Sequence, residues 1–304
     1  MLAEVRAFFA ARGVLEVDTP QLNNYAVTDR HLHSAQVSWP GSPARLKYLH
    51  TSPEYAMKRL LAAGSGDIYQ VCHVFRGEES SPVHNSEFTL LEWYRSGWSL
   101  AALMRELDEL LRLVLRARAD GITRYLSYEE AFVEVLGCNP LSDPDQRLAD
   151  CARALGLDDA LLRSCRRDDL LDLLMGTHIG PKLGLSGPVF VHRYPASQAA
   201  LARLDPDDAR VALRFELYLH GLELANGFEE LADGDEQAAR FRADQLFRAE
   251  RGLVVPEIDE VLLAAVRAVL PACAGVALGL DRVLMVACGA QRIDEVLSFG
   301  SERA

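Results

Sequence analysis

Two neighbouring segments of alternating polar and apolar residues constrain the fold more than any other feature of this chain. They run from Ile68 to Glu78 and from Glu87 to Arg95, and the polar loop between them contains Pro82. Alternation with a period of two is typical of β-strands, and a polar loop with proline favours a reversal of the chain. The sequence therefore predicts an antiparallel hairpin with a long, mobile tip.

The alternation also assigns side chains to the two faces of this hairpin. Arg76 and Glu78 fall on one face of the first strand, while Phe88, Glu92 and Tyr94 share a face of the second. At about 3.3 Å per residue, Glu92 lies about 13 Å from Phe88. Such a strip could hold a flat ring at its aromatic end and an ammonium group at its acidic end. Taken alone, however, each strand is better explained by an ordinary salt bridge or a half-buried strand.

Helical spacing and further strand patterns surround the hairpin. Helices are predicted at residues 1–12, 100–118, 233–251, 258–270 and 281–288, with short helical pieces over about 127–180. Strands are predicted at residues 14–17, 189–193, 214–224 and 275–281. Because most of these strands can pair antiparallel with helices outside them, the predicted class is α+β, with one large antiparallel sheet flanked by helices. We expect residues 1–304 to form a single domain with a helical insertion at about 120–185.

Two carboxylates bracket a turn-like dipeptide further along the chain. Glu223 and Glu230 lie on either side of Asn226-Gly227, a dipeptide that is common in hairpin turns. Carboxylates combined with triphosphate oxygens are the usual ligands of magnesium in proteins. The pair is therefore a candidate magnesium site.

The last strand pattern, Gly275 to Asp281, alternates very small residues with bulky apolar ones. One face of this strand is therefore nearly bare backbone, which suits the close approach of a helix or of a large ligand. Asp281 is predicted to cap the following helix, with Arg282 projecting over the bare face.

Composition excludes several classes of protein. The formal net charge of −12 argues against binding of nucleic acid through a broad basic face. No apolar run approaches the roughly 18 residues of a membrane span, and the first twelve residues do not resemble a signal peptide. A cytoplasmic location is therefore expected. The six cysteines form no C-x-x-C pair, so neither a zinc site nor a disulfide framework is predicted.

Considered together, these segments resemble the catalytic domain of class II aminoacyl-tRNA synthetases over nearly the whole chain. The first helix, its strand and Pro20 are similar to the first motif of that family, a dimer-interface element. Phe75 to Glu78 with His84 to Phe88 is similar to the second motif, and Gly275 to Arg282 is similar to the third. The ordered set is far more specific than any one motif, and it implies a homodimer that uses ATP and Mg²⁺.

Within this class the chain resembles the lysyl branch, through Thr51 to Glu54, Leu91 to Tyr94 and Gly221 to Phe228. The resemblance implies the catalytic residues Arg76 and Arg282. The residues implied to bind the amino acid are Ser52, Pro53, Glu54, Glu92, Tyr94, Asn226, Phe228, Glu230 and Ala277. Those implied to bind ATP are Arg76, Gly77, Glu78, His84, Asn85, Phe88, Glu223, Leu224, Gly279 and Arg282. Glu223 and Glu230 are implied to bind Mg²⁺.

The resemblance also implies roles for individual side chains. Glu54 would bind the backbone-side amine of the substrate, and Glu92, Tyr94 and Glu230 would bind the distal ammonium. The adenine ring would lie between Phe88 and Arg282.

A full lysyl-tRNA synthetase carries an N-terminal barrel that reads the anticodon, whereas this sequence starts at the helix of the first motif. That start, and Ala277 where lysyl-tRNA enzymes usually have Gly, resemble shortened paralogues that attach (R)-β-lysine to a lysine side chain of translation elongation factor P. The resemblance implies activation of (R)-β-lysine or lysine as the aminoacyl-adenylate and transfer to that protein, with release of AMP and pyrophosphate. We expect no anticodon-binding domain and no tRNA partner, although a short leading segment upstream is compatible with the sequence.

The chain departs from the family pattern at three places. The family usually has Asn at Gly77, Pro at Ser86, and an Arg for the γ-phosphate in the hairpin tip, where this chain reads Ser80 to Val83. Three alternative functions stay open: a minimal tRNA-lysylating enzyme, a non-catalytic regulatory paralogue, and a free-standing amide synthetase. The presence of Arg76, Glu223, Glu230 and Arg282 argues against the regulatory paralogue.

Overall fold

The computed structural model describes residues 1–38, 46–77, 81–300 and 303. The chain divides into two compact units. Unit 1 comprises residues 1–103 and 230–304, and unit 2 comprises residues 104–229. Within the described ranges, no helix combines the length and the apolar character that crossing a membrane requires. The single domain predicted for residues 1–304 stays a prediction.

Unit 1 contains the predicted hairpin at the centre of its sheet. The strands β5 (Ile68–Phe75) and β6 (Glu87–Ser96) pair antiparallel, and β11 (Cys273–Gly279) pairs antiparallel with β6. The short strand β1 (Leu15–Glu16) runs parallel to β5 at the edge. A small second sheet has the order β2-β4-β3, with strands Leu22–Asn23, Lys47–Leu49 and Gln36–Val37. The hairpin is confirmed; its tip includes residues 78–80, which lie outside the described residues.

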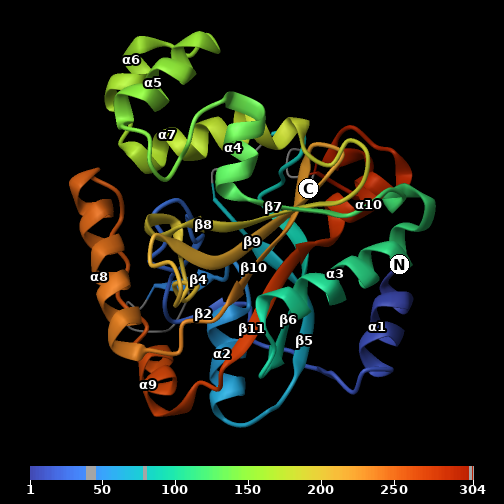
Figure 1. The fold of residues 1–304 in the computed structure, drawn as a ribbon. Coiled ribbons are helices and arrows are strands. Elements are labelled where there is room, and N and C mark those ends of the chain that lie inside the picture. Colours follow the sequence, from blue (N-terminus) through green and yellow to red (C-terminus); the bar gives the residue numbers. More distant parts are fainter. Residues whose placement is uncertain (39–45, 78–80, 301–302, 304) are drawn as a thin grey trace. The chain divides into compact units, whose positions relative to one another are not determined.

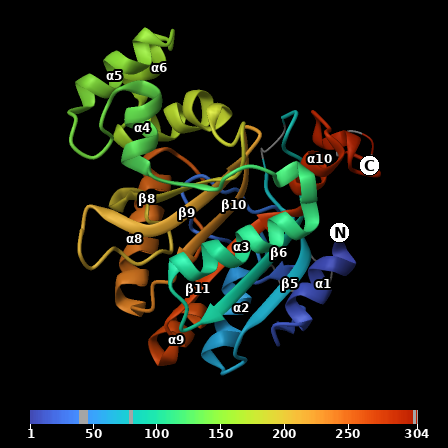
Figure 2. The ribbon, with the colours of Figure 1, turned by 45° about the vertical axis from the view of Figure 1, so that its right-hand side comes forward.

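The first helix, α1 (Leu2–Ala10), packs on this sheet through the spacing seen in the sequence. Val5, Phe8 and Phe9 are buried. The ring of Phe9 stacks on Tyr69 with centroids 4.5 Å apart and meets Trp93 edge to face at 5.3 Å. Burying a side chain of this size contributes about 1.5–3 kcal/mol. The helix is therefore fixed to β5 and β6 by aromatic contacts, as Figure 2 shows for its position beside β5.

Three helices, α2 (Glu54–Ala62), α8 (Gly234–Glu250) and α9 (Glu260–Val269), form a second group in unit 1 (Figure 1). The helix α9 packs against both α2 and α8. Asp233 caps α8 by accepting from the backbone N–H groups of Asp235 and Glu236, and Asp259 caps α9 in the same way. Such caps satisfy N–H groups that have no partner inside the helix. The predicted helices at 233–251 and 258–270 are confirmed.

Unit 2 holds four strands, together with four helices that lie in the predicted helical segment. The strands run in the order β10-β9-β8-β7, at Leu222–Glu229, Val211–Leu219, Val189–Pro195 and Arg124–Ser127. The helices are α4 (Tyr128–Leu136), α5 (Asp145–Ala154), α6 (Asp159–Ser164) and α7 (Arg167–Leu174). Leucines of α5, α6 and α7 share a buried core with Val189 and Val191 of β8. The helix α3 (Leu100–Leu115) runs across the sequence boundary between the units.

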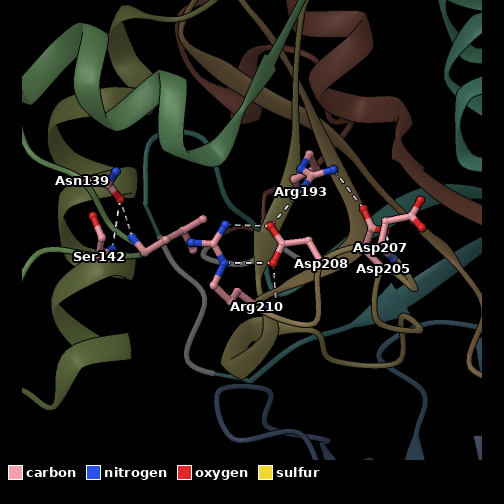
Figure 3. A network of polar contacts seen from close by, with 8 residues as sticks. Asn139, Ser142, Arg193, Asp205, Asp207, Asp208 and Arg210 are labelled. Carbon is pink, nitrogen blue, oxygen red and sulfur yellow. Dashed lines mark hydrogen bonds and ion pairs between the residues drawn. The ribbon is translucent and has the colours of Figure 1, made fainter.

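A polar network on unit 2 fixes the start of β9 (Figure 3). Arg193 has a left-handed φ of 59°, and its guanidinium bridges Asp205 at 2.9 Å and Asp208 at 3.1 Å. Asp208 also accepts from Arg210 at 2.9 Å. The left-handed backbone of Arg193 coincides with the irregular register between His192 and Tyr194, where a bulge redirects the strand.

Three sequence predictions need correction. The strand predicted at 214–224 is two strands, β9 and β10, which join at His220 and Gly221, both with positive φ, as two-residue hairpin turns require. Asn226-Gly227 therefore lies inside β10 and makes no turn. The sheet is also not purely antiparallel, because β1 and β7 pair parallel with their neighbours. The α+β class itself is confirmed.

Candidate active site

The face of β5, β6 and β11 that carries the site residues belongs wholly to unit 1. Across these strands Glu92 lies opposite Gln70 and Ala277, and Tyr94 lies opposite Gly275. Residues directly opposite one another in antiparallel strands point to the same face. The predicted strip from Phe88 to Tyr94 therefore has a floor made by the small residues of β11.

The acidic end of the strip is deeply buried. Glu92 is 3% exposed, and its Oε1 accepts a hydrogen bond of 2.7 Å from the hydroxyl of Tyr94. Burial, together with the charge of Glu54, raises the pKa of Glu92 to about 8. Burial and the neighbouring Glu92 also raise the pKa of Tyr94, so its hydroxyl remains a donor. A buried carboxylate of this kind is stabilised when an ammonium group binds beside it.

A buried lysine lies beside this end, and sequence reasoning missed it. The Nζ of Lys58 is 2.7 Å from Glu54 Oε1 and 2.6 Å from Glu230 Oε2. Burial would lower the pKa of Lys58, but the carboxylates of Glu230 and Glu54 outweigh it and raise that pKa, so the lysine stays charged. Burial raises the pKa of Glu230 to about 7, with Lys58 opposing the rise. The spacing of four between Glu54 and Lys58 in one helix was the available signal.

The predicted residues at the start of α2 are placed by local hydrogen bonding. Pro53 lies at the N-terminus of α2, and the hydroxyl of Ser52 accepts from the backbone N–H of Glu54 at 3.3 Å. Glu54 thus begins the helix with its side chain directed to Lys58 one turn later. Proline is favoured here because its missing N–H would have no helical partner.

The other end of the strip is cationic and aromatic. The guanidinium of Arg76 lies 5.1 Å from the centroid of the Phe88 ring, within the range of a cation–π contact. Arg282 donates through Nε to the carbonyl of Val83 at 3.2 Å. Burial, with Arg282 and then Arg76 nearby, lowers the pKa of His84 to about 4. Arg76 and Arg282 therefore lie near a neutral histidine, and Arg76 also lies beside an aromatic ring, a group suited to a polyphosphate and a base.

Smaller contacts shape the rest of this end. Asn85 donates to the carbonyl of Glu87 at 2.6 Å, and Gly77 donates to the carbonyl of His33 at 2.8 Å. A Cβ on Gly77 would lie 3.2 Å from the Cβ of His33, so the Asn usual in the family would need His33 to move. Glu78, predicted to contact ATP, lies outside the described residues.

The helix after the third motif starts differently from the prediction. The helix α10 (Leu280–Cys288) has Gly279 at its N-cap position, without a side-chain cap. Asp281 instead accepts a hydrogen bond of 2.6 Å from the backbone N–H of Thr89. The prediction that Asp281 caps the helix is therefore wrong, because its carboxylate joins α10 to β6.

The remaining predicted residues, Glu223, Leu224, Asn226 and Phe228, all lie on β10 in unit 2. The register shifts between Glu223 and Ala225, which marks a bulge. Asn226 lies opposite Glu216, and Phe228 lies opposite Arg214. Their predicted roles in binding stay predictions by resemblance.

A magnesium site requires oxygen ligands that remain accessible to the ion and its waters. Among the residues that the structure describes, no group of three or more His, Cys, Asp or Glu could hold a metal ion. The side chain of Glu230 is 1% exposed and paired with Lys58, whereas Mg²⁺ needs accessible carboxylate oxygens and keeps several waters. Glu230 therefore does not fit the metal role, although it fits the ammonium role.

Comparison with known proteins identifies the family. The model of the family "tRNA synthetases class II (D, K and N)" matches residues 1–303. A protein of Vibrio cholerae serotype O1 named elongation factor P (R)-β-lysine ligase is 51% identical over 308 residues, covering 100% of this chain and 94% of the relative. Proteins of the same name from Vibrio vulnificus and Pectobacterium atrosepticum are 49% and 48% identical, covering 98% and 100% of this chain and 93% and 94% of those relatives. The chain therefore belongs to the class II tRNA synthetase family.

Proposed function

We propose that this protein uses ATP to activate (R)-β-lysine, or lysine, and transfers the acyl group to a lysine side chain of translation elongation factor P. The observation that carries the proposal is the polarity of one strand face, with the buried carboxylate of Glu92 bonded to the Tyr94 hydroxyl at one end and the guanidinium of Arg76 beside Phe88 at the other. The name shared by relatives at 48–51% identity supports the acceptor and the β-lysine.

In the first step the substrate carboxylate attacks the α-phosphorus of ATP, an O–P bond forms, and pyrophosphate leaves. The nucleophile is already an anion, so no general base is required. Arg76 would neutralise charge that grows on the phosphoryl oxygens, and Phe88 with Arg282 would hold adenine. Positioning and electrostatic stabilisation account for most catalysis of this kind.

In the second step the amine of the acceptor lysine, having lost a proton, attacks the carbonyl carbon of the adenylate. A C–N bond forms, the C–O bond to phosphate breaks, and AMP leaves. The buried end of the strip would supply specificity for the amino acid, because a substrate without the distal amine would leave Glu92 without an ammonium partner.

We include Mg²⁺ in the proposal, with one candidate protein ligand in place of the two predicted from the sequence. When bound with ATP it would neutralise part of the triphosphate charge. Glu223 is the carboxylate that we retain as its candidate ligand, because Glu230 is committed to Lys58. We further propose a homodimer formed through the first motif, a cytoplasmic location, and no tRNA substrate, in keeping with the net charge of −12.

ATP–pyrophosphate exchange tests the proposal, with lysine and (R)-β-lysine as substrates and label transfer followed in the same tube. Strong exchange with (R)-β-lysine and label on elongation factor P is the expected result. Label on tRNA alone would indicate a minimal tRNA-lysylating enzyme, and label on a small free amine would indicate an amide synthetase. Absence of exchange with both amino acids would contradict the catalytic proposal.

A further inference from the structure

Lys58 joins two carboxylates that come from distant parts of the sequence. Glu54 precedes it by one turn of α2, while Glu230 follows β10, with its backbone N–H donating to the carbonyl of Cys273 at 2.9 Å. One oxygen of each carboxylate contacts the lysine ammonium. Lys58 itself is 2% exposed, so this contact is made in the protein interior.

The second oxygen of Glu230 is directed toward the substrate face. A Cβ placed on Gly275 would lie 2.7 Å from Glu230 Oε1 and 2.3 Å from the ring of Tyr94. Glu230 therefore reaches from Lys58 to the floor of the strip beside Tyr94. Its orientation depends on Lys58 at one oxygen and leaves the other for a second cation.

The charges of this region match a ligand with two ammonium groups. Glu54 and Glu230 both act electrostatically on Glu92, so the three carboxylates form one cluster. With Lys58 as the cation among them, the ionised cluster has a formal charge of −2. A diamino acid would balance this charge through its two ammonium groups, while its own carboxylate meets Arg76 at the other end.

We propose that Lys58 is a positioning residue that orients Glu54 and Glu230 for the two amines of the substrate and sets the charge of the cluster. It acts through these carboxylates and does not itself touch the substrate. This inference rests on the proposed function and assigns a role to a residue outside the predicted site. It also explains why Glu230 serves ammonium recognition and not metal binding.

The test compares three substitutions by direct binding of lysine in isothermal titration calorimetry. Lys58→Met removes the charge at nearly constant shape, Lys58→Arg keeps the charge, and Lys182→Met makes the first change at an exposed position. We expect Lys58→Met to weaken lysine binding at least tenfold while ATP binding changes less than twofold. Lys58→Arg should recover part of the loss, and Lys182→Met should match the wild type. Unchanged lysine binding in folded Lys58→Met would overturn the proposal, as would equal losses for lysine and ATP.

A second pair of variants keeps the test decisive if Lys58→Met does not fold. Lys58→Met with Glu230→Gln removes a cation and an anion together, which avoids an uncompensated buried charge. Its binding of lysine is compared with Glu230→Gln alone, in which Lys58 still holds Glu54. Weaker binding in the double variant supports the positioning of Glu54, and equal binding overturns it.

The same experiment separates the two levels of inference. Wild-type protein that binds lysine but shows no ATP–pyrophosphate exchange would refute the proposed function, while the Lys58 variants would still test the positioning role. Wild-type protein that binds neither lysine nor (R)-β-lysine would refute both.

Discussion

The two ends of the strip on β6 hold their own charged side chains in opposite settings. At the ammonium end, Glu92, Lys58 and Glu230 are each no more than 3% exposed, and each contacts a protein partner. At the nucleotide end, Arg76 and Phe88 are only partly buried. Burial makes an unmatched ligand costly, whereas a half-exposed cationic surface tolerates hydrated and mobile phosphates. We therefore expect the buried end to determine amino-acid specificity and the partly exposed end to provide general affinity for ATP.

The largest expected effect comes from Glu92→Gln. It removes the charge that we expect to face the distal ammonium. The loss of transition-state stabilisation should be about 2–4 kcal/mol, which lowers kcat/KM for (R)-β-lysine by about thirtyfold to a thousandfold. Binding of ATP should stay within about twofold of wild type. Exchange kinetics with each substrate varied in turn measure both quantities. Glu87→Gln is the matched control, because Glu87 begins the same strand with an exposed side chain. Equal losses for both substrates would remove the distinction between the two ends.

A smaller effect is expected from Gly275→Ala. The new Cβ would lie 2.3 Å from the ring of Tyr94, so the ring or the backbone must shift, at a cost of about 1–3 kcal/mol in stability. We expect a lower melting temperature and a raised KM for the diamino acid, with KM for ATP nearly unchanged. Gly176→Ala is the control, since a Cβ there meets no atom within 4 Å. A variant with normal stability and normal KM would mean that the floor is more adaptable than the packing indicates.

The dependence of binding on pH should follow Glu92. Because its pKa is raised to about 8, the free enzyme holds a neutral Glu92 at pH 7, and binding an ammonium group releases a proton. The KM for lysine should fall by up to about tenfold per pH unit as pH rises toward 8. Calorimetry in buffers of different ionisation enthalpy measures the proton release, which Glu92→Gln should abolish.

The same pKa gives a stability prediction with a defined sign. A folded-state pKa raised from 4.5 to about 8 contributes stability below the unfolded pKa, and this contribution is lost as pH rises through about 8. Relative to wild type, Glu92→Gln should therefore be more stable at pH 9 than at pH 5. Thermal unfolding at the two values checks this, and a difference of the opposite sign would contradict the assignment.

The smallest effect is expected from Phe88→Ala at the nucleotide end. Loss of one aromatic face and of its contact with Arg76 should weaken ATP binding by about 0.5–2 kcal/mol, or about twofold to thirtyfold. Lysine binding in the absence of ATP should not change. A variant that loses lysine binding as strongly as ATP binding would show that the two ends are coupled.

The sequence was sufficient for the parts of the fold that depend on local pattern. Period-two alternation placed Phe88, Glu92 and Tyr94 on one face, and the strand register confirms this placement. The hydrogen bond from Tyr94 to Glu92 is an additional finding. It was insufficient where two local patterns compete. Asn226-Gly227 is a strong turn signal, yet the turn forms at His220-Gly221, because pairing across β9 and β10 outweighs local preference.

The sequence pattern could not reveal which charged side chains are buried or which groups they contact. A Glu and a Lys four residues apart usually form an exposed pair on a helix surface. Here Lys58 is buried, and Glu230, from a segment far along the chain, gives it a second carboxylate. Likewise, an Asp at a helix start favours a cap, but Thr89 of β6 offers Asp281 a donor that the sequence does not reveal.

The pairing of β6 with β11 also has a consequence for the order in which the protein is made. β6 ends at Ser96, but the strand that completes its face begins at Cys273, and Glu230 is also synthesised late. Contacts between segments so far apart in sequence form slowly, because closing a long loop costs entropy before the contacts compensate for it. On the ribosome, Glu92 must therefore remain without its floor until nearly the whole chain has emerged. A nascent chain that stops before residue 273 should therefore bind lysine poorly, because the floor beside Glu92 is absent.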